Sequence, residues 1–245
     1  MVIATLLSKN HTLFGGETMI DWFLTYPIPL LQGLLLTLEL TALGLLFGLA
    51  VAVLFASILQ SHWRFLHYPI HAFTFFIRGT PLLVQIFLIY FGLSQFAWIR
   101  EQDWLWIWLQ EPFICAVLAL GLNSAAYTTV LLQGTFKTVP VGEIEAAKAL
   151  GLSSLQILRR IILPRATITA WSAYSNEVVL ILKSTALVST ITLLDLMGAI
   201  RQITAETYEM GTGLLIAGLV YGSLTAITVY LFRSVEKRFP PIHRR

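Results

Sequence analysis

The feature that most constrains this chain is a set of five long apolar stretches separated by charge-bearing connections. They cover approximately residues 30–59, 82–97, 113–133, 171–197 and 213–232. A helix needs roughly 20 mostly apolar residues to cross the hydrocarbon layer of a bilayer. Only 12% of the residues are charged, against about 25% in ordinary soluble domains. We therefore predict an all-α polytopic membrane protein with about five transmembrane helices.

The rest of the chain leaves no room for a separate soluble domain. We place one transmembrane domain at residues 19–240, a basic tail at 241–245 and a flexible extension at 1–18. The extension has a short apolar start and no small-residue cleavage site, so it does not resemble a secretory signal. The single cysteine, Cys115, lies inside an apolar stretch, which excludes a disulfide framework and a cysteine metal site within this chain.

The basic residues fix the expected orientation, because cytoplasmic loops of membrane proteins carry the excess of Lys and Arg. The connections after the first and third stretches and the carboxyl tail hold Arg64, Arg78, Lys137, Lys148, Arg159, Arg160, Arg165, Arg233, Lys237, Arg238, Arg244 and Arg245. The opposite connections hold few basic residues and many acidic ones. We therefore expect the N-terminus outside and the C-terminus inside. The net charge of +3 is the sum over two faces of opposite sign and does not indicate a nucleic-acid partner.

One cytoplasmic segment, residues 135–170, is too long to be a simple turn. Its pattern predicts a short helix over 143–150, a break at Gly151, and a second helix over 155–162 that Pro164 ends. Such a helix-turn-helix would project into the cytoplasm. Its first helix carries the small residues of Glu145-Ala146-Ala147, which let a partner surface approach closely.

The spacing of these residues resembles the EAA loop of ABC importer permeases. Three further stretches, 78–85, 122–129 and 174–185, narrow the resemblance to permeases of polar amino acid uptake systems, those for arginine or for histidine, lysine and ornithine. The resemblance covers nearly all of residues 19–237 and implies a type I ABC importer in a bacterial cytoplasmic membrane. It also implies that the loop docks into a cleft of the ATP-binding subunit. The residues assigned to this coupling are Glu145, Ala146, Ala147, Gly151, Leu155 and Pro164.

The resemblance further implies the partners of the chain. They are two copies of an ATP-binding subunit, a second and related permease that forms a heterodimer with this chain, and an external amino-acid-binding protein. The chain has no G-x-x-x-x-G-K-[ST] phosphate loop, so ATP and Mg are expected on the partner subunit. We expect no catalytic residue, cofactor or metal in this chain.

Polar side chains inside the apolar stretches are the candidates for a solute pathway, because ionisable residues cost ~2.5–3.5 kcal/mol each in a spanning helix and normally face a bundle interior or a watery cavity. The candidates are Glu39, Arg78, Thr80, Gln85, Asn123, Tyr127, Asn176, Glu177, Lys183, Ser184 and Thr185. Glu39 lies ~15 Å into the first stretch, near the midplane. It either contacts a cationic solute or binds a hydroxyl or Arg on a neighbouring helix.

The fourth stretch holds two polar pairs at helical spacing. Asn176 and Lys183 are seven residues apart and share one face, and Glu177 and Ser184 share the adjacent one. Glu177 and Lys183 are six apart, so they cannot form a salt bridge of the three- or four-residue type. Each therefore needs a partner elsewhere, which leaves a pathway role and a structural ion pair both open.

Other candidates also have structural alternatives. Arg78 and Thr80 could hold a solute carboxylate at a helix start, although we favour a capping threonine with an anchoring arginine. Gln85, Asn123 and Tyr127 could line the pathway or serve as interhelical hydrogen bonds.

Three other classes of protein fit the sequence less well. An ATP-independent secondary amino acid transporter would show paired inverted halves, and none is visible in the sequence. A scaffold that only anchors a complex would leave the ionisable residues of the spans without a role. An intramembrane enzyme would need a nucleophile with a base, or a metal-ligand spacing, and no such pattern rises above chance. The sequence does not indicate which amino acid is carried.

Overall fold

The structure is a computed structural model that describes residues 19–61 and 64–238, in which every regular element is a helix. This confirms the all-α fold class; the predicted segments 1–18 and 241–245 lie outside the described residues. The elements are α2 (Met19–Thr25), α3 (Pro27–Leu59), α4 (Arg64–Gly79), α5 (Leu82–Phe87), η1 (Leu88–Gly92), η2 (Leu93–Gln95), α6 (Ala97–Arg100), α7 (Asp103–Leu109), α8 (Pro112–Phe136), α9 (Val141–Ala149), α10 (Ser154–Ile157), η3 (Leu158–Ile162), α11 (Leu163–Ser184), η4 (Thr185–Ile191), α12 (Leu196–Thr207) and α13 (Met210–Glu236).

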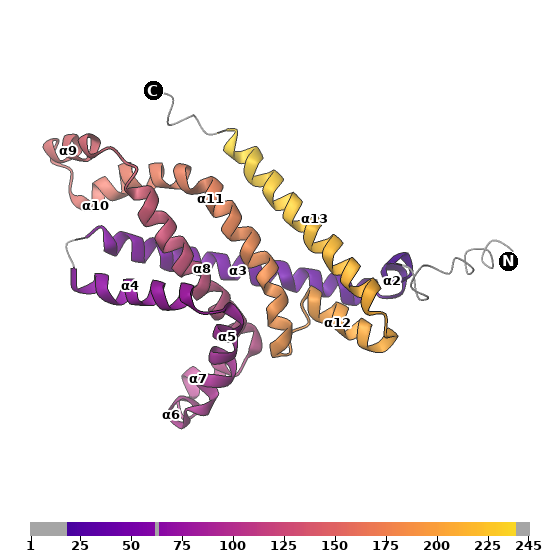
Figure 1. Cartoon of the computed structure of the whole chain (residues 1–245). Coiled ribbons are helices and arrows are strands. Elements are labelled where there is room, and N and C mark those ends of the chain that lie inside the picture. Colours follow the sequence, from indigo (N-terminus) through magenta and orange to yellow (C-terminus); the bar gives the residue numbers. More distant parts are fainter. Residues whose placement is uncertain (1–18, 62–63, 239–245) are drawn as a thin grey trace.

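Three of these helices, α3, α8 and α13, are each long and apolar enough to cross a membrane. Two bent helix pairs also qualify, one over residues 64–95 with a bend of 110° and one over 168–207 with a bend of 50°. The described residues thus supply three crossings, or up to five if each bent pair is one. Figure 1 shows α9 and α10 at one end of the molecule and α2 and α12 at the other.

Helices α3 and α8 form the central pair, and small residues bring their backbones together. A Cβ atom at Gly48 would lie 2.8 Å from the Gly121 carbonyl oxygen, and one at Gly44 would lie 3.1 Å from Leu120 Cβ. Lipid tails are as apolar as the surfaces of the helices, so the hydrophobic effect does not drive helices together inside a membrane. Close packing of this kind is therefore a main source of helix association there.

Helix α4, which precedes the 110° bend, packs against α3 and α8. The His67 Nε2 atom lies 3.2 Å from the Ile58 carbonyl oxygen, and the Phe55 and Phe73 rings meet edge to face at 5.4 Å. The α4–α5 bend is therefore held against the central helix pair.

The expected capping role of Thr80 at this bend is wrong. Pro81 occupies the N-cap position of α5 and makes no side-chain cap. The Thr80 hydroxyl instead donates to the Phe76 carbonyl oxygen at 3.0 Å. Pro81 lacks the N–H that would continue α4 and is extended at φ −62°, ψ 134°, and α4 ends at Gly79.

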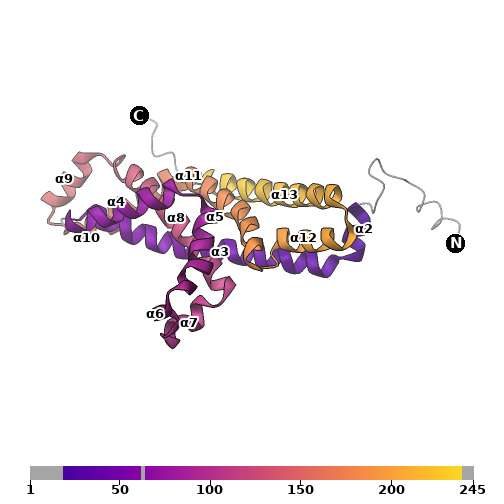
Figure 2. The same ribbon diagram turned by 60° about the horizontal axis from the view of Figure 1, so that its bottom comes forward.

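Asp195 lies in the interior, where it connects three helices. Its side chain is fully buried and caps α12 by accepting hydrogen bonds from two backbone N–H groups at 3.1 and 3.3 Å. The Tyr221 hydroxyl of α13 donates to it at 3.2 Å. The Leu196 N–H donates to the Thr37 hydroxyl of α3 at 3.0 Å. Asp195 and Leu196 thus join α12 to α13 and α3, and Figures 1 and 2 show α12 beside α13 and the same end of α3.

Candidate functional site: a helical hairpin and a polar cavity

The predicted helix-turn-helix is formed by α9 and α10, and Gly151 closes it. Gly151 has φ +78°, in the left-handed region that L side chains rarely adopt. Its N–H donates to the Lys148 carbonyl oxygen at 2.9 Å, and the Leu152 N–H donates to the Ala147 carbonyl oxygen at 3.1 Å. These two bonds form a Schellman motif, so the glycine is required by the geometry of the turn.

The second half of the hairpin starts with a capping box and continues without a stop. The Ser153 side chain accepts from the Gln156 N–H, and the Gln156 side chain accepts from the Ser153 N–H. The chain then passes through the π-helical turn η3 directly into α11. The prediction that Pro164 ends this helix is wrong. Pro164 is the second residue of α11, which directly follows the π-helical turn η3, so the helical run passes through it.

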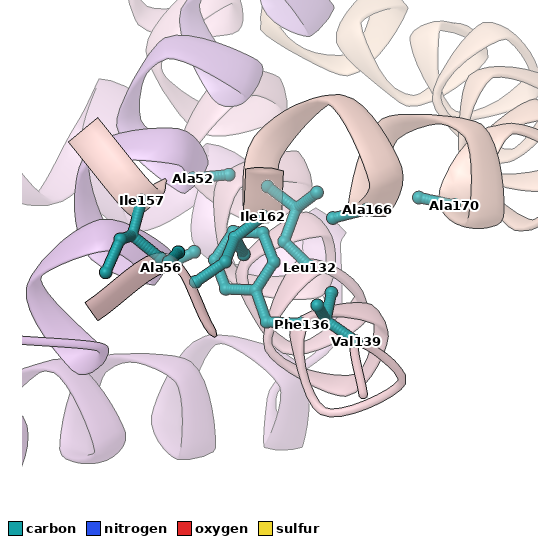
Figure 3. Packing of buried hydrophobic residues seen from close by; sticks show 10 residues of the cluster. Ala52, Ala56, Leu132, Phe136, Val139, Ile157, Ile162, Ala166 and Ala170 are labelled. Carbon is teal, nitrogen blue, oxygen red and sulfur yellow. The ribbon is translucent and has the colours of Figure 1, made fainter. Parts of the chain in front are cut away.

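A buried apolar cluster joins the hairpin to the spanning helices (Figure 3). Figure 3 shows Ile157 and Ile162 close to Ala56 of α3 and to side chains of α8 and α11. The full cluster is Ala52, Ala56, Leu132, Phe136, Val139, Ala147, Ile157, Ile162, Ala166 and Ala170. In addition, Arg165 of α11 forms an ion pair with Glu143 of α9. The hairpin therefore cannot move without moving the ends of α3, α8 and α11.

The outer side of the hairpin is apolar and acidic and has no cover within the described residues. Val141, Leu150 and Leu155 are 67%, 80% and 62% exposed, and Glu145 is exposed between them. The six residues assigned to coupling thus divide by position. Ala147 is buried and holds the hairpin to the cluster, whereas Glu145, Ala146, Gly151, Leu155 and Pro164 are exposed. Exposed leucines around a carboxylate form a surface suited to docking.

The second feature is a cavity of about 260 Å³ at the break between α4 and α5. It is lined by Thr80, Pro81, Leu82, Asn123, Tyr127, Glu177, Leu180, Ile181 and Ser184. Five of the predicted pathway residues are among these: Thr80, Asn123, Tyr127, Glu177 and Ser184. Glu177 and Ser184 reach the same cavity, as their seven-residue spacing requires. Glu177 is the only charged residue of this lining, and it is 6% exposed.

Gln85 supports the cavity wall without lining it. Its side-chain amide donates to the Ile77 carbonyl oxygen at 2.7 Å and to the Thr80 hydroxyl at 2.9 Å. Its amide oxygen accepts from the Asn123 side chain at 3.0 Å. Because Gln85 is buried and its groups are satisfied, it holds the α4–α5 break in shape and fixes the orientation of Asn123.

Arg78 stands beside the cavity, with its guanidinium carbon 5.2 Å from the centroid of the Tyr127 ring. This is a cation–π distance, and the Tyr127 hydroxyl also lies 3.5 Å from the Arg78 carbonyl oxygen. Arg78 therefore fixes one wall residue of the cavity and is itself exposed.

The remaining candidates lie away from the cavity. Asn176 and Lys183 are exposed on the neighbouring face of α11, and Thr185 is buried and donates to the Leu182 carbonyl oxygen at 2.8 Å. Glu39 is exposed on α3, which contributes no residue to the cavity lining.

The apolar wall of the cavity was not predicted. It is formed by Pro81, Leu82, Leu180 and Ile181. The sequence pattern does not distinguish these residues, because a spanning helix has the same apolar composition whether a side chain faces lipid, another helix or a cavity.

The chain was compared with known proteins. The family described as "Binding-protein-dependent transport system inner membrane component" matches residues 44–240. The octopine transport system permease protein OccM of Rhizobium meliloti is 41% identical over 218 residues, 89% of each chain. The histidine/lysine/arginine/ornithine transport system permease protein HisM of Escherichia coli K12 is 41% identical over 207 residues, 84% of this chain and 87% of the relative. A solved amino acid ABC transporter with histidines matches with a TM-score of 0.79 and 30% identity, over 91% of this chain and 99% of that one.

These matches confirm the resemblance seen in the EAA spacing and in the three membrane motifs. They cover the cavity, the hairpin and the crossings together, and the relatives are transport permeases. The chain therefore belongs to the family of binding-protein-dependent transport system inner membrane components, as a multi-pass permease of an amino acid ABC importer.

Proposed function

We propose that this permease carries amino acids with a cationic side chain inward across a bacterial cytoplasmic membrane, and that the cavity around Glu177 is its part of the solute pathway. The observation that carries the proposal is the buried Glu177 carboxylate, which lines the cavity with no basic residue in the same lining. A buried carboxylate is costly unless a cation or hydrogen-bond donors accompany it. The Ser124 hydroxyl is a neighbouring hydrogen-bond donor to this carboxylate, and a guanidinium, ammonium or imidazolium group would supply the cation.

The rest of the lining suits an amino acid. Thr80, Asn123, Tyr127 and Ser184 offer hydroxyl and amide groups for the α-ammonium and α-carboxylate, and the apolar wall accommodates a methylene chain. The cavity, at about 260 Å³, is just below the roughly 300–1,000 Å³ of typical small-molecule sites. This size is consistent with half a site, which a second permease completes. The names of HisM and OccM support the cationic class, because octopine, like arginine, contains a guanidinium group.

In this proposal two ATP-binding subunits hydrolyse ATP, and the α9–α10 hairpin of each permease docks on one of them. Closure of the ATP-binding pair pulls the two hairpins together. The apolar cluster around Phe136 passes that displacement to α3, α8 and α11, which switches the cavity between outward and inward access. An external binding protein delivers the solute, and the second permease is a related chain. The hairpin then lies in the cytoplasm, with the N-terminus outside and the C-terminus inside.

The test is the ATPase activity of the reconstituted transporter, with its binding protein, in the presence of single amino acids. We expect arginine, lysine, histidine, ornithine or octopine to stimulate hydrolysis, and glutamine and glutamate to stimulate it far less. Stimulation by glutamate equal to that by the basic amino acids would refute the cationic class. Failure of any ATP-binding subunit to associate would refute the coupling and favour an ATP-independent transporter.

Variants of Glu177 assign the effect to the cavity. Glu177→Gln keeps the shape of the side chain and removes its charge, so we expect uptake of cationic amino acids to fall by at least tenfold, with a smaller loss for Glu177→Asp. Glu236→Gln, an exposed position at the end of α13, is the matched control and should transport as the wild type does.

A further inference from the structure

Helix α3 has one covered face and one bare face. The covered face carries Gly33, Thr37, Leu40, Gly44 and Gly48, all buried, and packs on α8 and α12. The opposite face carries a row of exposed residues that we call the Glu39 stripe: Gln32, Leu35, Glu39, Leu43 and Leu46. At 100° per residue these five positions fall within one narrow arc of the helix.

Glu39 has no partner among the residues that the structure describes. The structure gives it no hydrogen bond or ion pair with any described residue, and α3 contains no Lys, Arg or His. Glu39 is 12 residues from Pro27 and 20 from Leu59, so it lies about 18 Å into a helix that spans the membrane. A carboxylate at that depth against lipid is unfavourable, and the ends of the helix are too far for it to reach water.

We propose that the Glu39 stripe is covered by a spanning helix of the second permease, which presents a cation or a hydrogen-bond donor to the Glu39 carboxylate. The inference rests on the proposed function, since that function requires a pair of permeases. It adds the surface by which this chain meets its partner and the polar contact at its centre.

The other possible neighbours fit less well. Lipid offers no donor at this depth. The ATP-binding subunit and the binding protein lie outside the bilayer and cannot reach the middle of α3. A watery solute pathway would not be lined by Leu35, Leu43 and Leu46, which are 57%, 38% and 65% exposed, and the polar cavity is built from α8, α11 and the α4–α5 break.

The spacing of the stripe also indicates how the helices cross. Gln32, Glu39 and Leu46 are seven residues apart, and Leu35 lies between the first two at the complementary position of the heptad. This spacing favours a partner helix that runs alongside α3 at about 20°, as in left-handed membrane bundles. Glu39 at the centre of such a contact would fix its register, the best-attested role of a buried polar residue between helices.

The test uses the whole transporter, purified in detergent through a tag on the ATP-binding subunit. The measured quantities are the amount of second permease that accompanies this chain and the temperature at which the two separate. We expect Glu39→Leu, which makes α3 more apolar and cannot hinder its insertion, to reduce the recovered pair by tenfold or more. Glu39→Gln keeps a hydrogen-bonding group and should lose less. Leu38→Ala, which is exposed on α3 but outside the stripe, is the control and should leave the pair intact.

Three results would overturn the inference. If Glu39→Leu assembles as well as the wild type and transports normally, Glu39 faces lipid. If both Glu39 variants assemble normally but lose uptake of cationic amino acids more than of neutral ones, Glu39 contacts the solute. If the wild-type chain recovers no second permease, the pairing itself fails, and the proposed function fails with it.

Discussion

The sharpest test of the coupling hairpin is Gly151→Ala. Gly151 is left-handed at φ +78°, and an added Cβ would meet no atom within 4 Å. The cost of the substitution is therefore the backbone cost alone, about 1–2 kcal/mol for a non-glycine residue in this region. A hairpin that relieves this strain must give up the two hydrogen bonds of the Schellman motif and change the angle between α9 and α10.

The backbone strain in Gly151→Ala should lower the affinity of the permease for the ATP-binding subunit. If only the native hairpin docks, the apparent dissociation constant equals the intrinsic one divided by the fraction of molecules that keep the native hairpin. About 1–2 kcal/mol corresponds to roughly a 5- to 30-fold loss. The assay is titration of the ATP-binding subunit onto the permease in nanodiscs, together with ATP-driven uptake. Gly151→Asn should lose less, since Asn tolerates the left-handed region.

Gly142→Ala supplies the matched control. Gly142 lies in α9 of the same hairpin, its added Cβ would also meet nothing within 4 Å, and its φ is not positive. Alanine there favours the helix by up to about 1 kcal/mol, so binding should be unchanged or tighter. Equal affinity for Gly151→Ala, Gly142→Ala and the wild type would show that the turn geometry does not control docking.

Two further predictions concern the hairpin and the orientation. Glu145→Lys reverses an exposed charge on the docking side of α9. It should abolish uptake while the amount of permease in the membrane stays normal. Uptake at the wild-type rate would show that Glu145 does not contact the ATP-binding subunit. In a Cys115→Ala background, a cysteine at Asp103 should react with an impermeant reagent added outside and one at Ser153 only after the membrane is opened; the reverse pattern would invert the proposed topology.

Much of this architecture could be predicted because it follows from local chemistry. Apolar length identifies the long helices α3, α8 and α13, since a spanning helix has few alternatives in lipid. The break at Gly151 and the shared face of Glu177 and Ser184 follow from backbone freedom and helical periodicity. The hairpin was therefore located correctly, although its second helix was expected to stop at Pro164.

What could not be predicted depends on packing between distant segments. Pro164 carries the same local signal whether it ends a helix or begins one, and only the continuation of η3 into α11 decides between the two. Asp195 is polar and near the end of an apolar stretch, which suggests solvent, but Tyr221 of α13 and the start of α12 satisfy its oxygens in the interior. For Glu39, the depth along α3 can be estimated from the sequence, but the face of α3 that it occupies depends on which residues pack on α8.

The hairpin and the cavity are connected by the same two helices, and this gives the coupling a physical basis. On α8, Leu132 belongs to the cluster under the hairpin and Asn123 lines the cavity, nine residues or ~14 Å further along the helix. On α11, Ala170 belongs to the same cluster and Glu177 lines the cavity, seven residues or ~10 Å apart. A displacement at the cluster therefore reaches both walls of the cavity over two or three helical turns, without any flexible segment between them. Because the α4–α5 break forms the third wall and is fastened to α8 by Gln85 and Asn123, the cavity should change shape as α8 and α11 move relative to each other.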